Sequence, residues 1–585
     1  MLKQLIVLFL TLLVNIGFAQ HTSVHEAQSL YYKALGLKTI TQYDSIQGFN
    51  GKDHITSLKS SLQKRVFGYH PYWMGNAWQN YRWDLLSDLC FFSYETDPAT
   101  GNAVTTNGFE TAVVVDTALA HGVKVHLCVT LFSGHATFFN NPESRQTLIG
   151  NLISLVTQRG IQGINLDFEA VPSSQQQGLT SFILQLADAL HANLPGTELS
   201  IAAPAVNWSN TFDLPAIAPS LDLIMIMAYD FYWSGSTLAG PVAGYWPLTS
   251  SFNYAVNHSL SYYQSQGIPP EKLLLGLPYY GREWSVSTNT LPASTTGSST
   301  AVTYRNVRNN SSGFYTPGNQ YWDPYSYNPY YSYFNGNWWQ CFYDDVRSLG
   351  AKYDLVNRRN TGGIGIWALG YDNGYPDLWN LIEEKFTQSP VYPCRDTLYD
   401  PGGPWWNYGD DEFYTETVTS DYPGPLMLNF EELSLETGFD SLWIYDGPDV
   451  NAPLMATLSG DQAPSGLATS GNSFTLRFNT DGATTRSGYA LEWSCPTASI
   501  NETTTPDFSI YPNPADDQLF ISRIDNKHDL WSTELFDVRG RLIQAGNSGK
   551  MDRVALSLED CREGVYVLKV NSNGNINFYK IVICH

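Results

Sequence analysis

The residues best suited to chemistry lie in the stretch GINLDFEAV (163–171), where polar side chains occupy alternate positions of an apolar run. Asn165, Asp167 and Glu169 share one face if this stretch is a strand, because successive side chains of a strand point to opposite sides. A buried strand has no structural need for acids. A partly buried Glu beside another carboxylate has a raised pKa and can act as a general acid near neutral pH. The stretch therefore predicts acid–base catalysis centred on Glu169.

Eight apolar runs, separated by helix-length segments, would position these residues. The runs span residues 66–73, 89–95, 124–132, 163–169, 199–205, 223–230, 272–281 and 362–370. Continuous apolar strands that alternate with helices are typical of a parallel sheet, and eight of them predict a closed (β/α)8 barrel with its chemistry at the carboxyl ends of the strands. A doubly wound open sheet is the alternative, but the chain has no GxGxxG motif.

The connection between the seventh and eighth runs, from Trp284 to about Gly362, is unusually long and rich in Tyr, Trp, Asn and Gly. Loops of this size are uncommon unless they carry function or structure of their own. We expect an insertion that walls one side of a cleft. A surface decoration with its own small core is the alternative.

Composition indicates an exported protein of several domains. A chain of 585 residues is too long for one core. Its net charge of −23 disfavours nucleic acid and anionic membranes as partners. The first residues, from Lys3 through an apolar run to Gly17 and Ala19, predict a signal peptide at 1–19. Since no other apolar run reaches membrane length, we expect no transmembrane segment.

The remaining chain divides into a helical linker segment and three modules. We expect the segment at 20–62, the barrel at 63–388, a β-sandwich at 394–495, a linker at 496–507 and an all-β module at 508–585. The cysteines form no CxxC pair, which argues against zinc and redox motifs. Cys90 and Cys128 lie in apolar runs and should be buried. The candidate disulfides are Cys394 with Cys495 and Cys561 with Cys584.

Four motifs, in order along the chain, resemble those of family 18 glycoside hydrolases. They are QGINLDFE (162–169), similar to the signature D-G-x-D-x-D-x-E, then MAYD (227–230), YYGREW (279–284) and GIWALG (365–370). The resemblance implies a hydrolase of β-1,4-linked N-acetylglucosamine polymers, chitin first. It also implies a retaining mechanism in which the substrate's own acetamido group attacks the anomeric carbon, without a cofactor.

The same resemblance assigns roles to residues. Glu169 would protonate the leaving oxygen and later activate water, while Asp167 would hold the acetamido N–H and Tyr229 its oxygen. Asp230 would support the distorted sugar, and Trp367 would stack beneath it. The remaining motif residues expected to bind substrate are Met227, Tyr280 and Arg282. Trp73 suits either a sugar platform or packing at the barrel mouth.

Two positions depart from the signature. Gln162 and Asn165 stand where the family usually has Asp, and TLFSGH (130–135) replaces S-x-G-G. The amide of Asn165 can donate a hydrogen bond to Asp167 as a protonated Asp would, so we expect Asp167 to stay oriented and the pH dependence to change. The lone residues His70 and His135 are expected to be structural hydrogen-bonders.

The two trailing modules resemble known families. The stretches 394–404, 435–447 and 478–495 resemble a bacterial CUB domain, which implies adhesion or substrate targeting. Its calcium-binding acids would be Glu436, Asp440 and Asp481, although these also suit ordinary loop acids. The pieces SIYPNPADDQL (509–519), LFDVRGRLI (535–543) and LEDCREGVYVLKV (558–570) resemble the type IX secretion sorting domain of Bacteroidetes. That resemblance implies export through the outer membrane, followed by release or surface attachment.

Two other functions remain open. Peptidoglycan and the chitobiose core of N-glycans present the same acetamido group as chitin. A carbohydrate-binding adhesin, in which neither the barrel nor the CUB-like module cuts, is the alternative of a different class.

Overall fold

The computed structural model describes residues 22–49, 61–496, 508–524, 530–537, 541–549, 551–572 and 575–584. The predicted signal peptide and most of the predicted linker at 496–507 lie outside these ranges. The chain divides into two compact units, with the boundary between Cys495 and Pro496. Within the described ranges, no helix has the length and apolar character needed to cross a membrane.

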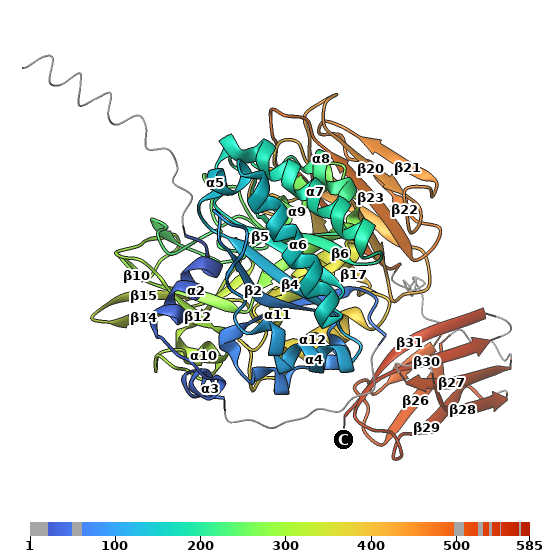
Figure 1. The fold of residues 1–585 in the computed structure, drawn as a ribbon. Helices are drawn as coiled ribbons and strands as arrows, with labels where there is room; N and C mark the ends of the chain where they lie inside the picture. The colour runs from blue at the N-terminus through green and yellow to red at the C-terminus, as the bar shows by residue number, and fades with distance from the viewer. Residues whose placement is uncertain are drawn as a thin grey trace, which may run out of the picture. The chain divides into compact units, whose positions relative to one another are not determined.

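Eight parallel strands form the predicted barrel (Figure 1). They are β1 (Arg65–Pro71), β2 (Asp88–Thr96), β4 (Lys124–Leu131), β5 (Gly163–Phe168), β6 (Glu198–Pro204), β7 (Leu223–Met227), β9 (Leu273–Pro278) and β16 (Gly363–Trp367). Their order is β1-β16-β9-β7-β6-β5-β4-β2, and pairing of β2 with β1 closes the ring. The closure excludes the doubly wound open sheet. The short strand β3 (Ala103–Thr105) pairs antiparallel with the end of β2.

Helices cover the outside of the ring. They are α4 (Val113–Ala120), α5 (His135–Phe139), α6 (Pro142–Arg159), α7 (Gln176–Asn193), α8 (Leu214–Ile217), α9 (Val256–Ser265), α11 (Val346–Arg358) and α12 (Asp377–Phe386). The apolar side chains of α7 recur every three or four residues and form its buried face. Phe168 of β5 lies parallel to Phe182 of α7, with ring centroids 5.7 Å apart. The apolar set of β5 therefore faces the helices.

The long connection after β9 folds into a five-stranded antiparallel sheet of order β12-β10-β15-β14-β13. Its elements are β10 (Tyr280–Val286), β12 (Thr300–Thr303), α10 (Tyr304–Arg308), β13 (Gln320–Asp323), β14 (Asn328–Asn335) and β15 (Asn337–Phe342). The short strands β8 (Leu238–Ala239) and β11 (Ala293–Ser294) pair with each other. The insertion thus has a sheet of its own, and its first strand, β10, continues directly from barrel strand β9.

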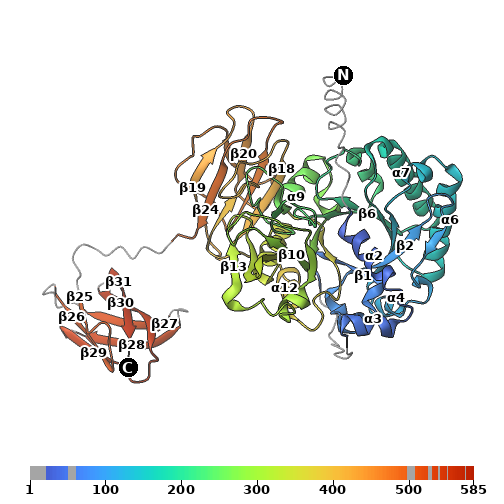
Figure 2. The ribbon, with the colours of Figure 1, turned by 90° about the vertical axis from the view of Figure 1, so that its left-hand side faces the viewer.

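Among the described residues before β1, two helices form, α2 (Val24–Ala34) and α3 (Ile40–Gln47). The Ser23 hydroxyl caps α2, and Thr39 with Gln42 forms a capping box on α3. Figure 2 shows α2, in blue, within the outline of the barrel unit rather than apart from it.

The second module is the predicted β-sandwich, with sheets β17-β24-β19-β22 and β18-β23-β20-β21. Its strands are β17 (Arg395–Tyr399), β18 (Phe413–Thr419), β19 (Met427–Ser434), β20 (Ser441–Tyr445), β21 (Leu454–Leu458), β22 (Leu467–Ala468), β23 (Ser473–Asn479) and β24 (Gly488–Ser494). Cys394 and Cys495 form the predicted disulfide. Strand β18 packs against α9 and α11 of the barrel.

The third module also has two sheets, β25-β26-β29 and β28-β27-β30-β31. Its strands are β25 (Phe508–Tyr511), β26 (Gln518–Arg523), β27 (Trp531–Asp537), β28 (Leu542–Gly549), β29 (Arg553–Ser557), β30 (Gly564–Ser572) and β31 (Asn575–Ile583). Cys561 and Cys584 do not form the predicted disulfide. Cys561 packs into the core of the module whereas Cys584 is exposed, so the two thiols lie in different environments.

Candidate active site

The predicted catalytic residues gather at the carboxyl ends of three barrel strands. Asp167 lies in β5 and Glu169 directly after it, Tyr229 and Asp230 follow β7, and Trp367 ends β16. In a (β/α)8 barrel these ends open to the same face. Residues from distant parts of the sequence therefore meet at one mouth.

Asn165 lies deeper in the same row and is fully buried. Its amide nitrogen donates to the Ser200 hydroxyl at 2.9 Å, and its oxygen accepts from the Tyr69 hydroxyl at 3.0 Å. The predicted hydrogen bond from Asn165 to Asp167 is therefore wrong. Ser200 is the register partner of Asn165 on the adjacent strand β6, so its hydroxyl takes the amide N–H. The Oδ1 atom of Asp167 has no hydrogen-bond partner among the described residues.

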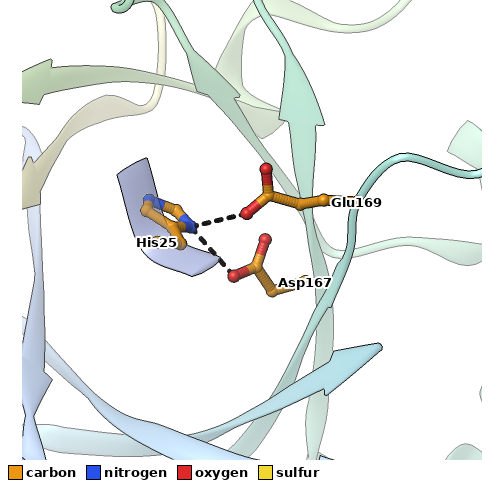
Figure 3. Close-up of side chains that lie close together, drawn as sticks. All are labelled: His25, Asp167 and Glu169. Carbon is orange, nitrogen blue, oxygen red and sulfur yellow. Dashed lines mark hydrogen bonds and ion pairs between the residues drawn. The ribbon is translucent and has the colours of Figure 1, made fainter. Parts of the chain in front are cut away.

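The two carboxylates converge on His25 of α2 (Figure 3). His25 Nδ1 lies 2.9 Å from Asp167 Oδ2 and 3.1 Å from Glu169 Oε1. The Ser23 hydroxyl donates to the same Glu169 oxygen at 2.9 Å. Sequence reasoning missed both residues, because they precede the first strand and belong to none of the recognised motifs.

Burial and charge shift the pKa values of this pair. Burial raises the pKa of Glu169 and the charge of Asp167 raises it further, while His25 and Ser23 lower it, giving about 7. Burial lowers the pKa of His25, but Asp167 and Glu169 outweigh that effect and raise it to about 10. At neutral pH the imidazole of His25 is therefore positively charged and pairs with the carboxylates. Glu169 can both hold and release a proton near this pH.

The other nitrogen and the ring face of His25 contact two more of the predicted residues. Nε2 lies 2.8 Å from the Tyr229 hydroxyl, and the ring lies over Trp367 with centroids 3.7 Å apart. One turn further along α2, the side-chain oxygen of Gln28 accepts hydrogen bonds from Trp367 Nε1 at 3.0 Å and from the Tyr371 hydroxyl at 2.8 Å. Helix α2 thus contacts the predicted acid, its neighbouring carboxylate and the predicted sugar platform.

Asp230 is held by the insertion. Arg282 donates to its two oxygens from Nε at 2.9 Å and Nη2 at 2.8 Å, and the Tyr280 hydroxyl donates at 2.7 Å. Asp230 has a left-handed backbone with φ of 58°. Met227 ends β7 and is half-buried. The insertion therefore fixes one residue of the site through β10.

Trp73 and the two noted histidines are buried away from solvent. Trp73 is fully buried and stacks on Tyr32 of α2, with centroids 4.9 Å apart. His70 contacts the Tyr81 hydroxyl at 2.9 Å, and burial lowers its pKa to about 3. His135 Nε2 contacts the backbone carbonyl of Leu131, the last residue of β4, at 3.1 Å. Both histidines act as structural hydrogen-bonders, and Trp73 packs at the barrel mouth beneath α2.

Residues 65–372 match the model of glycosyl hydrolases family 18. The chain belongs to this family. Residues 408–493 match the CUB domain and residues 509–584 match the secretion system C-terminal sorting domain, which confirms the other two resemblances. The sorting domain indicates export, to the medium or to the outer-membrane surface.

Several relatives of this family 18 hydrolase are similar over the barrel. The putative sporulation-specific glycosylase YdhD of Bacillus subtilis is 28% identical over 317 residues, covering 52% of this chain and 69% of the relative. The probable endochitinase of Caenorhabditis elegans is 29% identical, covering 42% of each chain. The cortical fragment-lytic enzyme of Bacillus anthracis is 25% identical, covering 52% of this chain and 69% of the relative.

Solved chitinase structures share the fold. A class V chitinase mutant from Nicotiana tobaccum superposes with a TM-score of 0.50 at 20% identity, covering 55% of this chain and 98% of that one. The group IV chitinase of Ostrinia furnacalis gives the same TM-score and identity, covering 56% and 100%. The barrel therefore has the family 18 fold.

Three groups of side chains in the described ranges bring possible metal ligands within 4.8 Å of one another. They are His25, Asp167 and Glu169; Asp88, His126 and Glu198; and Glu436, Asp440 and Asp481. In the second group, Arg65 and Lys124 already neutralise the acids. The third group is the trio predicted to bind calcium in the CUB domain.

Proposed function

We propose that this chain hydrolyses β-1,4-linked N-acetylglucosamine polymers, chitin first, with retention of configuration and with the substrate's acetamido group as nucleophile. One observation carries the proposal. Asp167, Glu169, Tyr229 and Trp367 all lie around a single small volume, since each contacts the same imidazole ring. A pyranose ring with a 2-acetamido group needs these partners in one place.

Each side chain suits its step. The raised pKa of Glu169 lets it carry a proton near neutral pH, give it to the leaving oxygen and then take one from water. The Oδ1 atom of Asp167, which lacks a partner within the described part of the chain, can accept the acetamido N–H and offset the developing positive charge. The Tyr229 hydroxyl donates to the acetamido oxygen, and Trp367 supports the sugar from below.

The test compares substrates and a matched variant. Colloidal chitin, peptidoglycan and a high-mannose glycoprotein are assayed side by side, because relatives named endochitinase and cortical fragment-lytic enzyme suggest different polymers. Since His25 contacts both carboxylates, the chain and its His25→Ala variant are both assayed. In whichever form is active, Glu169→Gln should lose activity by a factor on the order of 10² to 10⁴. Unchanged turnover in Glu169→Gln would refute the mechanism.

Failure of every form to cut any of the three polymers would favour the adhesin. In that case binding without product release, measured by pull-down on the same insoluble polymers, identifies the ligand.

The CUB domain is proposed to bind calcium through Glu436, Asp440 and Asp481, because carboxylate oxygens suit a hard cation. Burial and the nearby acids raise the pKa of Asp410 at the same place, so a cation would relieve a concentrated negative charge. Adding calcium to the chelated chain should raise its melting temperature by several degrees, and Asp481→Ala should abolish that rise. The control variant Asp461→Ala should keep the rise. A rise in Asp481→Ala equal to that of the control would contradict the site.

A further inference from the structure

The helix that precedes the barrel occupies the place where the proposed substrate must bind. Ser23 caps α2, and His25 and Gln28 lie on it. Together these residues contact both carboxylates, the tyrosine hydroxyl and the tryptophan of the site. His25 is fully buried there, although it is a titratable side chain. Nothing in the proposed reaction uses it.

The imidazole takes the positions that the proposed function assigns to the acetamido group. Its Nδ1 atom lies 2.9 Å from Oδ2 of Asp167, beside the oxygen proposed to accept the acetamido N–H, and its Nε2 atom lies 2.8 Å from the Tyr229 hydroxyl proposed to hold the acetamido oxygen. Its ring lies over Trp367, where the sugar ring would stack. A sugar and His25 cannot occupy this volume together.

The rest of the N-terminal segment is fastened to the barrel by side chains outside the site. Tyr32 stacks on Trp73, and Lys33 pairs with Glu95. Asp44 accepts hydrogen bonds at 2.8 Å from the backbone and side chain of Asn76. Further along, Arg305 donates to the backbone carbonyls of Gln47 and Gly48. These contacts hold residues 22–49 as a folded cover.

We propose that residues 22–49 form an inhibitory segment that blocks the active site of its own chain, with His25 as the substrate mimic, and that hydrolysis requires this segment to leave. The inference rests on the proposed function. Because the segment precedes β1, the first barrel strand, it can leave without breaking the barrel.

Point variants on α2 test the block in the full chain. His25→Ala should raise kcat/KM on a chito-oligosaccharide about tenfold or more, since a larger fraction of molecules becomes open to substrate. Gln28→Ala, which removes an acceptor of two hydrogen bonds, should raise it about fivefold. Leu30→Ala is the matched control, because Leu30 lies on the same helix and is 54% exposed, and its activity should stay within about twofold. Lower or equal activity in His25→Ala, with an unchanged melting temperature, would overturn the proposal.

A second measurement detaches the segment after folding. A protease recognition site placed between positions 51 and 60 allows cleavage, and size-exclusion chromatography then separates the released segment. Activity should rise with separation and fall again when the segment is added back. A cleaved and separated chain that keeps its secondary structure but gains no activity would count against the block.

The charge of His25 predicts how the block depends on pH. The groups that face it are the carboxylates of Asp167 and Glu169, the hydroxyl of Tyr229 and the rings of Tyr69 and Trp367. Its pKa is raised from 6.5 to about 10 when docked, so protonation favours docking fully below 6.5 and ceases to do so as pH rises through 10. The activity ratio of His25→Gln to the intact chain should therefore shrink over that range. A constant ratio would contradict the charge pairing on which the docking is argued.

Binding separates failure of this inference from failure of the proposed function. Chito-tetraose should bind more tightly to the double variant His25→Ala/Glu169→Gln than to Glu169→Gln, even though neither cuts. Equal, tight binding to both would overturn the block and leave the proposed function standing. No binding to either form, with no hydrolysis by any form, would refute both the block and the proposed function.

Addition of EDTA tests whether an ion holds the site. A gain of activity by the intact chain on adding EDTA would assign the site to an ion and overturn direct docking of His25.

Discussion

At the residue scale, Asn165 determines how much negative charge the floor of the site contains. It is fully buried, two residues before Asp167 on the same face of β5, and it links Tyr69 to Ser200 across three strands. An aspartate at this position would put a second carboxylate beside a buried one. The amide keeps the hydrogen bonds of the row and avoids that charge.

The variant Asn165→Asp should therefore lower stability in a pH-dependent way. An aspartate titrates near 3.9 when unfolded, and burial beside Asp167 raises its folded pKa. The loss in free energy of unfolding should be absent below the unfolded pKa of about 3.9. It should grow as pH rises toward the folded pKa, reaching about 3 kcal/mol at neutral pH. Melting temperatures at pH 4 and pH 7 measure it, with Ser200→Ala as an uncharged control. Equal losses at both pH values would contradict this explanation.

At the element scale, the sequence predicts the parts whose signals are local. Each of the eight apolar runs becomes a barrel strand, and each motif falls at a strand end, because burial on both faces leaves a continuous apolar pattern. The partner of Asn165 depends on the register between β5 and β6, which no local pattern specifies. The docking of α2 depends on tertiary contacts alone, so the sequence by itself predicts only a helical linker segment at 20–62.

The insertion acts on the site through one strand. Arg282 and Tyr280 of β10 bind Asp230, whose carboxylate is largely buried. The two hydrogen bonds from the guanidinium fix the direction of that carboxylate. The predicted insertion therefore positions a residue of the barrel mouth.

Loss of the guanidinium should destabilise the barrel. Arg282→Met leaves Asp230 without its ion-pair partner, at a cost of about 3 kcal/mol, and adding Asp230→Asn should recover most of it. A cycle of the two single variants and the double variant, measured by melting temperature, gives the coupling. If the stability losses of the two single variants add up to the loss of the double variant, Arg282 and Asp230 are not coupled.

At the scale of the whole molecule, the barrel and the CUB domain form one unit through buried charges. Glu416 of β18 pairs with Arg358 at the end of α11, and the guanidinium of Arg359 lies 3.7 Å from the ring centroid of Tyr414. These side chains are almost fully buried. The CUB domain is therefore held against the barrel rather than carried on a free linker.

Glu416→Ala should loosen this interface. It removes the acid that neutralises Arg358, so the melting temperature should fall and proteases should cut more readily between the barrel and the CUB domain. Arg395→Ala, which breaks the exposed pair with Glu492, is the matched control and should change neither measurement. Identical proteolysis of the two variants would refute an interface held by Glu416.

The disulfide between Cys394 and Cys495 joins the two ends of the CUB domain, 101 residues apart in the chain. Tension applied to the tail after Pro496, as when an anchored protein is dragged by a bound polymer, enters this module at Cys495. The covalent bond passes that tension straight to Cys394 and on to the barrel, so the intervening strands are bypassed. The module is thereby mechanically shielded, and pulling would first strain the connection to α12.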